Sequence, residues 1–291
     1  MRITQQMMSN QFIQSYQKSV EATGKLQQQI ASSKRIEKPS DDPYGTVQSL
    51  SYQSTLNEID QYQKNAQDGI TMAEATDTAI GQVTSILQRV RELTVQGSTD
   101  SYSDADRKNM ATEIKSLQQE LGNVANTTLG NRYLFSGTDN TAPYQNGALQ
   151  SSNQEGVQWN IGKGVSVTAN VTAPALFGNV ADGKNLFDTV NSVAQTLDNG
   201  GNPNSIIATI DKQLDNVSTQ RAIVGTKQNL LESASSQLDQ TSITTQKMLS
   251  NIADVDVAKA YTDLSSQEAV MKAALSAGAK IIQPSLVDFL R

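Results

Sequence analysis

Neither cysteine nor histidine occurs anywhere in this sequence of 291 residues. Their absence excludes disulfide cross-links and Cys/His zinc sites, and it removes the thiol nucleophile, the Ser–His pair and the histidine general base. Stability must therefore come from packing. We predict a protein that is not an enzyme and has no catalytic, metal-binding or cofactor-binding residues.

Aromatic residues, basic charge and long apolar runs are also scarce. Aromatic residues make up 5% and apolar residues 37% of the chain, which is lean for an enzyme with thick cores. The formal net charge of −6 argues against a nucleic-acid binder. No stretch approaches the roughly 20 apolar residues of a membrane span. The N-terminus lacks the apolar core of a cleavable signal peptide, so we expect a cytoplasmic protein or export by a route that reads no such signal.

Glycine divides the chain into three parts. Nine of the 18 glycines lie between Gly137 and Gly201, whereas both flanks are glycine-poor and periodic. The middle part also contains an alternating pattern typical of a hairpin around residues 162–164. We predict a small β-rich domain over residues 138–203, with Trp159 as its core anchor and a short helix near residues 186–197. The alternating apolar positions are Val157, Trp159, Ile161, Val165, Val167, Ala169 and Val171.

A long helix is predicted before this insert, from about Tyr44 to Gln96. Asp42 suits the helix cap, Pro43 suits the first helical position, and Gly97 is a stop signal. Apolar and small residues recur every seven positions, which predicts lengthwise packing on other helices. This stripe comprises Ile59, Ala66, Ala73, Ile80, Leu87 and Thr94.

Two further helices extend the pattern. Ser103 and Asp106 form a variant of the capping box, which begins a helix that ends near Asn126. The C-terminal arm, residues 204–250, repeats the seven-residue spacing of the first arm. Because the two long arms carry matching stripes, we expect the chain to fold back on itself. The C-terminal stripe comprises Ile210, Val217, Val224, Leu231, Leu238, Thr245 and Ile252.

Both ends of the chain carry short apolar helical patterns. Two such ends without a core beside them would expose a large apolar patch. Either they pack on each other within one chain, or they stay loosely ordered until neighbouring subunits bury them. We favour the second alternative, because ordering about 70 residues costs more backbone entropy than a two-helix hairpin recovers. The predicted subunit and partner interface comprises Ile3, Met7, Phe12, Leu26, Ile30, Leu264, Met271, Leu275, Ile282, Leu286 and Phe289.

These patterns predict a mainly α fold: an elongated antiparallel bundle of long helices, with coiled-coil terminal helices and a small inserted β domain. Residues 1–38 and 257–291 would form the terminal coiled-coil segments, residues 39–137 and 204–256 a helical rod, and residues 138–203 the outer insert. Pro284 should disturb the last helix near its end.

Two acidic clusters have both a functional and a structural interpretation. Asp41 and Asp42 would suit a metal or acid–base site, but capping of the helix that begins at Pro43 is the favoured interpretation. Residues 100–106 resemble a calcium loop that lacks the required glycine and closing glutamate, so we predict a turn.

Two other charged groups lie at predicted helix surfaces and ends. Arg89, Arg91 and Glu92 have the charges to bind an anion, but a solvated face or an ion pair between subunits is favoured. Asp254 and Asp256 are predicted to cap or join two C-terminal helices.

Short motifs in a fixed order carry a family resemblance: MRI at 1–3, KRI at 34–36, KPSDDP at 38–43, QRVREL at 88–93, ANTT at 125–128, YLFSGT at 133–138 and PSLVDFL at 284–290. Together they resemble the bacterial flagellin-type axial proteins, and most closely the hook-associated protein 3 family. Typical flagellins differ at residues 39–45 and seldom carry the run at 134–138. Residues 65–70 and the terminal Arg291 are flagellin-like.

The resemblance implies a structural adaptor that joins the flagellar hook, through hook-associated protein 1, to the flagellin filament by helical polymerisation of its terminal helices. It implies further copies of the chain as partners and an export chaperone that shields the C-terminal helix. It also implies an extracellular location at the hook–filament junction, reached by flagellar type III export as an unfolded chain.

Three alternatives to the adaptor stay open. One is a minor or short flagellin, and the second is a coiled-coil binding module that does not polymerise. The third is an enzyme hidden in the insert, which the lack of histidine and of clustered carboxylates in residues 138–203 disfavours.

Overall fold

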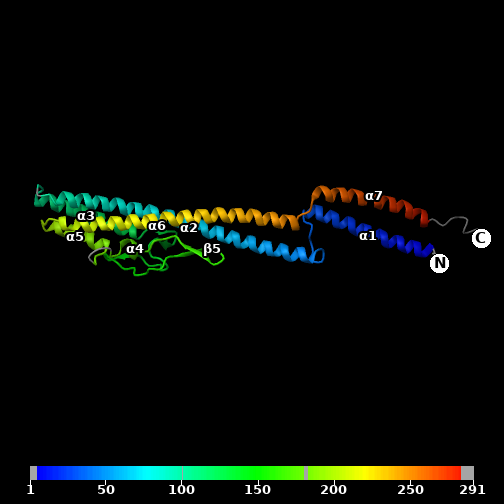
Figure 1. The fold of residues 1–291 in the computed structure, drawn as a ribbon, viewed down its shortest axis with the longest axis horizontal. Helices are drawn as coiled ribbons and strands as arrows, with labels where there is room; N and C mark the ends of the chain where they lie inside the picture. Colours follow the sequence, from blue (N-terminus) through cyan, green and yellow to red (C-terminus); the bar gives the residue numbers. More distant parts are fainter. Residues whose placement is uncertain (1–4, 100, 180–182, 283–291) are drawn as a thin grey trace, which may run out of the picture. The chain divides into compact units, whose positions relative to one another are not determined.

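In the computed structural model, the residues described are 5–99, 101–179 and 183–282. The helices are α1 (Gln5–Ser32), α2 (Pro43–Gly97), α3 (Asp104–Ala125), α4 (Ala173–Phe177), α5 (Leu186–Asp198), α6 (Asn204–Ala253) and α7 (Val257–Ile282), with short strands between α3 and α4 (Figure 1). The predicted mainly α fold with long helices and short antiparallel strand pairs is confirmed.

The chain forms two compact units. The terminal unit contains residues 1–58 and 242–291, and the central unit contains residues 59–241. The chain passes from one unit to the other within α2 and again within α6. The three-part division expected from the sequence, with its boundaries at residues 38, 137, 203 and 256, stays a prediction.

Helix α2 begins and ends where the sequence predicts, and its two ends have different causes. Asp42 Oδ1 accepts a hydrogen bond from the Gly45 N–H at 2.9 Å, which caps the first turn, and Pro43 is the first helical residue. At the other end, a Cβ on Gly97 would overlap the side chain of Leu197 from α5. The glycine therefore permits a close approach of α5 in addition to marking the end of α2.

The central unit is built on the predicted seven-residue stripes. A Cβ at Gly69 would lie only 3.0 Å from Leu231 Cδ1, so α2 and α6 pack closely at this point. Each fully buried aliphatic side chain contributes about 1.5–3 kcal/mol, which makes the stripes the main source of stability here. The stripe residues that are at most 1% exposed include Ala66, Ala73, Ile80 and Leu87 of α2 and Ile210, Val217, Val224 and Leu231 of α6.

The basic residues near the end of α2 form ion pairs within the chain. Arg89 pairs with Glu113 of α3 at 2.7 Å, and Arg91 pairs with Asp211 of α6 at 2.6 Å. The pairs are formed within one chain and lie on a solvated face, which was one of the two expected arrangements. All four side chains are more than 40% exposed, so each pair contributes at most about 1 kcal/mol and mainly fixes the helix register.

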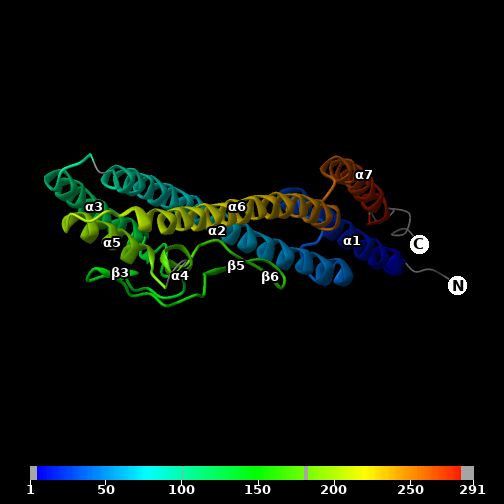
Figure 2. The same cartoon turned by 60° about the vertical axis from the view of Figure 1, so that its left-hand side comes forward.

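The strands between α3 and α4 form three separate antiparallel pairs, the first just before the insert and the other two within it. They are β1 (Thr128–Leu129) with β2 (Arg132–Tyr133), β3 (Tyr144–Gln145) with β4 (Ala148–Leu149), and β5 (Gln158–Gly162) with β6 (Val165–Thr168). Figure 2 labels β3, β5 and β6 of the insert. The last pair is the predicted hairpin, in which Trp159 lies opposite Val167. The other two pairs were not predicted, because strands of two residues leave no alternation to detect.

Phenylalanines, rather than the predicted tryptophan, form the aromatic core of the central unit. The rings of Phe135 and Phe177 meet edge to face at 5.4 Å, and those of Phe177 and Phe187 lie 5.5 Å apart. All three are at most 1% exposed. Trp159 is only partly buried and lies beside Gly69 of α2. The core is therefore built where α4 and α5 meet the segment after β2.

Candidate assembly interface

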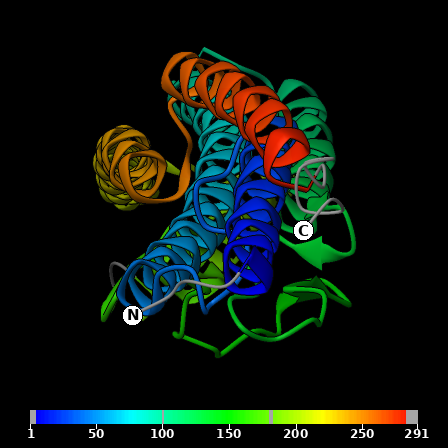
Figure 3. The same ribbon diagram turned by 90° about the vertical axis from the view of Figure 1, so that its right-hand side faces the viewer.

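Helices α1 and α7 of the terminal unit lie side by side (Figure 3). Their partly or fully buried residues recur with alternating spacings of four and three, which is the pattern of a coiled-coil seam. On α1 these residues are Phe12, Tyr16, Ser19, Thr23, Leu26 and Ile30, and on α7 they are Ala260, Leu264, Gln267, Met271, Ala274 and Gly278. Pairing of the two ends within one chain, one of the two alternatives above, is therefore present.

The seam is narrow and partly polar. Gly278 lies so close to Phe12 that a Cβ on this glycine would overlap the aromatic ring. In the middle of the seam, Gln267 Nε2 donates to Ser19 Oγ at 3.5 Å, and Thr23 Oγ1 donates to the Ser19 carbonyl at 2.9 Å. Because small and polar residues bury little apolar area, the seam covers only one stripe of each helix.

The outer faces of α1 and α7 carry several exposed large apolar side chains among polar ones. In the described part of the chain, 13 of the 19 exposed large hydrophobic side chains lie in the terminal unit, although the central unit is longer. Such a concentration is typical of a surface that another protein covers. Those on α1 and α7 are Met7, Met8, Ile13, Val20, Val257, Tyr261, Val270 and Leu275.

The predicted interface residues fall into three groups. Five are partly buried in the seam: Phe12, Leu26, Ile30, Leu264 and Met271. Two are exposed on the outer faces: Met7, at 61%, and Leu275, at 48%. Ile3, Leu286 and Phe289 lie outside the described residues, as does Pro284, and Ile282 is the last residue of α7, where only the backbone is described.

Sequence reasoning missed part of the outer face. Ile13 and Val20 are 45% exposed and were not assigned to the interface. They are seven residues apart and directly follow the seam residues Phe12 and Ser19. The spacing of seven indicates that Ile13 and Val20 share one face of α1, but the repeat ends at Gln6 and Gln27, so the signal for them in the sequence is weak.

Two linkers meet between these helices and the long ones, and we call this contact the linker joint: residues 33–42 and 253–256. The Arg35 N–H donates to the Ala253 carbonyl at 2.7 Å, and the Val255 N–H donates to the Ser33 carbonyl at 3.1 Å. Between these bonds, Lys34 Nζ lies 2.6 Å from Asp254 Oδ1. Ser33 has a left-handed φ of 56°, which turns the chain out of α1 into the joint.

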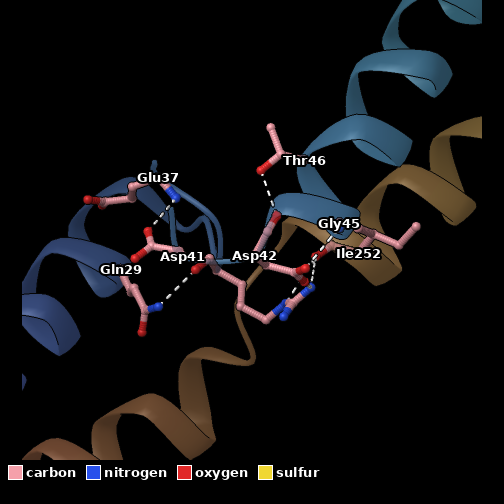
Figure 4. A network of polar contacts seen from close by, with 8 residues as sticks. Gln29, Glu37, Asp41, Asp42, Gly45, Thr46 and Ile252 are labelled. Atoms are coloured by element: carbon pink, nitrogen blue, oxygen red, sulfur yellow. Dashed lines mark hydrogen bonds and ion pairs between the residues drawn. The ribbon is translucent and has the colours of Figure 1, made fainter. Parts of the chain in front are cut away.

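Arg35 links two helix ends within the joint, which are marked in Figure 4 by Ile252 of α6 and by Asp42 at the start of α2. Its Nε and one terminal nitrogen donate to the Ile252 carbonyl, at 3.0 and 2.8 Å, in the last turn of α6. The same terminal nitrogen lies 3.1 Å from Asp42 Oδ2, the cap of α2. A cation at a helix C-terminus and an anion at an N-terminus both complement the helix dipoles. The guanidinium group of Arg35 therefore binds a carbonyl at the end of α6 and the capping carboxylate of α2 at the same time.

The acidic residues of the joint cap and cross-link helices, as the structural interpretation of the sequence predicts. Asp41 accepts a bond from Lys25 at 2.8 Å, which lowers the pKa of its carboxyl group. The Gly45 N–H lowers the pKa of Asp42, and Lys34 followed by Ser250 lowers that of Asp254. Asp256 caps α7 by accepting the Lys259 N–H at 3.1 Å. Each of these carboxylates therefore has a structural partner.

Acidification is expected to open the linker joint. The folded-state pKa values of Asp41 and Asp254 are lowered, so their contribution is complete above about pH 4, the ordinary carboxyl pKa, and is lost as pH falls through the lowered values. The amides of Arg35 and Val255 should then lose hydrogen-exchange protection as the pH falls below about 4, after correction for intrinsic rates.

The variant Asp254→Asn is the matched control for this pH dependence. It removes one titrating group and keeps the side-chain shape, so we expect lower protection of both amides near neutral pH and a smaller change on acidification. If protection in the unmodified chain stayed constant over this pH range, the carboxylates would not be what holds the joint.

The described residues give no indication of a metal site or of a membrane-spanning helix. Within them, acidic side chains do not gather into a group of three that could hold a metal ion. Every helix described also falls short of the length or apolarity needed to cross a bilayer.

Both helical arms of the chain match a known protein family. Residues 3–140 match the bacterial flagellin N-terminal helical region, and residues 207–290 match the bacterial flagellin C-terminal helical region. The flagellar hook-associated protein 3 of Escherichia coli (strain K12) is 28% identical over 215 residues, which are 72% of this chain and 65% of that protein. A Listeria monocytogenes flagellin is also 28% identical, over 271 residues that cover 89% of this chain and 88% of its own length.

Solved structures share the fold. A putative flagellar hook-associated protein from Vibrio parahaemolyticus superposes with a TM-score of 0.68 at 23% identity and covers 74% of this chain and all of that one. Hook-associated protein 3 from Legionella pneumophila has a TM-score of 0.62 at 17% identity and covers 70% of this chain and 99% of that one. At these identities the likeness establishes a common fold.

Proposed function

Because this chain belongs to the bacterial flagellin family of flagellar axial proteins, we propose that it is the adaptor subunit that joins the hook to the filament. The family is structural rather than enzymatic and self-assembles in the flagellum. In the proposed role, the chain binds hook-associated protein 1 on the hook side and flagellin on the filament side. Copies of the chain polymerise helically through α1 and α7.

The observation that carries this proposal is the concentration of exposed large apolar side chains in the terminal unit. A narrow seam with glycine, serine and threonine cannot cover two apolar faces, so each subunit needs neighbours beside it. Contacts of this kind are heterologous, and heterologous contacts that do not close into a ring generate a helical tube. The loosely ordered state of the ends before assembly stays a prediction.

Export and chaperoning form part of the same proposal. The chain has no cysteine or histidine, so neither a disulfide nor a Cys/His metal site has to be undone before it threads through a narrow channel unfolded. The apolar C-terminal helix α7 would be exposed before assembly, and an export chaperone that covers it would prevent premature association.

A minor or short flagellin is the second candidate. One observation favours it: the Listeria monocytogenes flagellin aligns with more of this chain than the Escherichia coli hook-associated protein does. The run at residues 133–138 favours the adaptor, since typical flagellins seldom carry it. In this structure the run contains three core residues, Leu134, Phe135 and Ser136, each at most 1% exposed.

Deletion of the gene distinguishes the two candidates. For an adaptor, we expect cells that build hooks, lack filaments and release flagellin into the medium, with filaments restored by the gene on a plasmid. Filaments that stay intact in the deletion strain would contradict the adaptor role. Electron microscopy of the cells and immunoblotting of the culture medium provide the measurements.

A further inference from the structure

The central unit contains an open cleft of about 710 Å³ between α3, the β3–β4 hairpin and α5. One wall is a single face of α3, on which Gln118, Gln119, Asn123 and Asn126 follow helical spacing. Asn191 of α5 lies across from them. Carboxamides, each with two donor hydrogens and an acceptor oxygen, therefore dominate this cleft.

The cleft has little net charge to offer a ligand. Its lining contains one charged side chain, Lys115, whose Nζ lies 2.8 Å from Asp198 Oδ2. The carboxylate neutralises the cation, and the same contact lowers the pKa of Asp198. An anionic ligand would have to compete with this pair, so the cleft suits an uncharged ligand that forms hydrogen bonds.

One carboxamide of this wall already holds a peptide segment of the chain itself. Asn126 Nδ2 donates to the Tyr144 carbonyl at 2.7 Å, and the Tyr144 N–H donates to Asn126 Oδ1 at 2.9 Å. The side chain thus pairs with both main-chain groups of one residue in β3, as a neighbouring strand would. This pair shows how the wall recognises an extended chain.

The same kind of contact recurs elsewhere in the central unit. Asn65 of α2 donates to the Asn160 carbonyl in β5 at 2.7 Å, and Asn216 of α6 donates to the Ala175 carbonyl at 3.1 Å. In each case a carboxamide on a long helix fixes a segment of the insert through its main chain. Carboxamide-to-backbone bonding is therefore a general device by which these helices hold neighbouring segments.

The remaining carboxamides of the cleft are free to form such bonds. Gln118, Gln119, Asn123 and Asn191 make no side-chain hydrogen bond to any described residue. We propose that the cleft binds an extended, uncharged polypeptide segment of a partner protein, held by hydrogen bonds from its main chain to these carboxamides. This inference is independent of the adaptor role.

A peptide fits these observations better than a saccharide does. Sugar sites commonly use the open face of an aromatic ring as a platform, because the ring packs against the C–H surface of the sugar. The aromatic residue of this cleft, Tyr144, stacks on Phe187 at 4.2 Å and contacts α3 at Gly122, so its ring is already used in packing. The available groups are amides, which match the alternating donors and acceptors of an extended backbone.

Fluorescence anisotropy with the full-length protein tests this proposal. The probe is a labelled library of ten-residue peptides made of Ser, Thr, Val, Ala and Gly, which covers many sequences because main-chain recognition tolerates side-chain changes. We expect saturable binding that weakens at least tenfold in the double variant Gln119→Leu, Asn123→Leu. Asn109→Leu, an exposed residue of α3 outside the cleft, is the matched control and should bind as the unmodified protein does.

Two further measurements keep the proposal falsifiable. Peptides with N-methylated backbones have lost their main-chain donors and should not bind, and maltotriose should not compete. Absence of binding across the library, binding that survives N-methylation, or displacement by the sugar would each overturn the proposal. Circular dichroism of both variants checks that α3 has kept its helical structure.

Discussion

A chain that carries Ile13→Glu and Leu275→Glu is expected to fold normally and to fail in assembly. Both side chains lie on the outer faces of α1 and α7, where they are 45% and 48% exposed. In the isolated subunit the new carboxylates stay in water and cost little. In the polymer a neighbouring subunit would have to bury two unpaired charges, and burial of even one is strongly unfavourable. We expect cells with hooks, without filaments and without swimming motility.

Val165→Glu provides the control for this assembly prediction. Val165 is 53% exposed and begins β6 in the insert of the central unit. The substitution adds the same charge at similar exposure, so it should leave motility unchanged. The double variant should also match the unmodified chain in helix content by circular dichroism. Normal filaments on cells that carry only the double variant would place the assembly surface elsewhere.

Phe177→Ala is expected to cause the largest loss of stability. Phe177 is fully buried and contacts both Phe135 and Phe187, so truncation leaves a cavity that α4 cannot fill. Large-to-small changes of this kind cost about 3–5 kcal/mol. Guanidinium-induced unfolding, followed by the fluorescence of Trp159, should show the transition of the central unit at lower denaturant concentration.

The exposed residue Leu129, in β1, supplies the comparison for this stability prediction. Leu129→Ala removes a side chain that is 38% exposed, so its expected effect is within about 1 kcal/mol. A similar cost for both substitutions would mean that the three phenylalanines do not form the aromatic core of the central unit. Loss of exchange protection in α4 and α5, but not in the middle of α2, would locate the damage.

Long-range periodicity made the helical part of this fold predictable. The stripes of α2 and α6 persist over many turns, and local rules fixed the start of α2 at Pro43 and the capping box at Ser103. These signals depend on neighbouring residues or on repeats, which a sequence displays directly. The short α5 followed from the same pattern, and its apolar positions Phe187, Val190 and Val193 are buried.

The linker joint and the aromatic core depend on contacts that a sequence does not display. Arg35 binds the Ile252 carbonyl across a separation of 217 residues, and a backbone acceptor has no signature in the side-chain pattern. The sequence predicts Trp159, in the alternating pattern of the hairpin, as the core anchor of the insert, but this residue is only partly buried. The buried aromatic residue is Phe177 instead, which helix α4 brings against Phe135. A helix of five residues is too short to be detected from the sequence.

The motifs behind the family resemblance have structural roles in this molecule. The segment at residues 38–43 supplies the carboxylates of Asp41 and Asp42 to the linker joint. In the segment at residues 133–138, Gly137 has a φ of 67°, and a Cβ there would overlap the Glu155 carbonyl. Residues that shape a joint or a tight turn tolerate few substitutes, which is why these short runs can be recognised.

The linker joint joins segments from opposite ends of the sequence, so it closes late in folding. Lys34 and Asp254 are 220 residues apart, so the ion pair between the two linkers can form only when most of the chain is present. Closing so long a loop carries an entropic penalty that only an already folded intervening segment reduces. A chain that ends before residue 252 therefore cannot close the linker joint, because both groups that its first linker contacts, the Ile252 carbonyl and the Asp254 carboxylate, are missing.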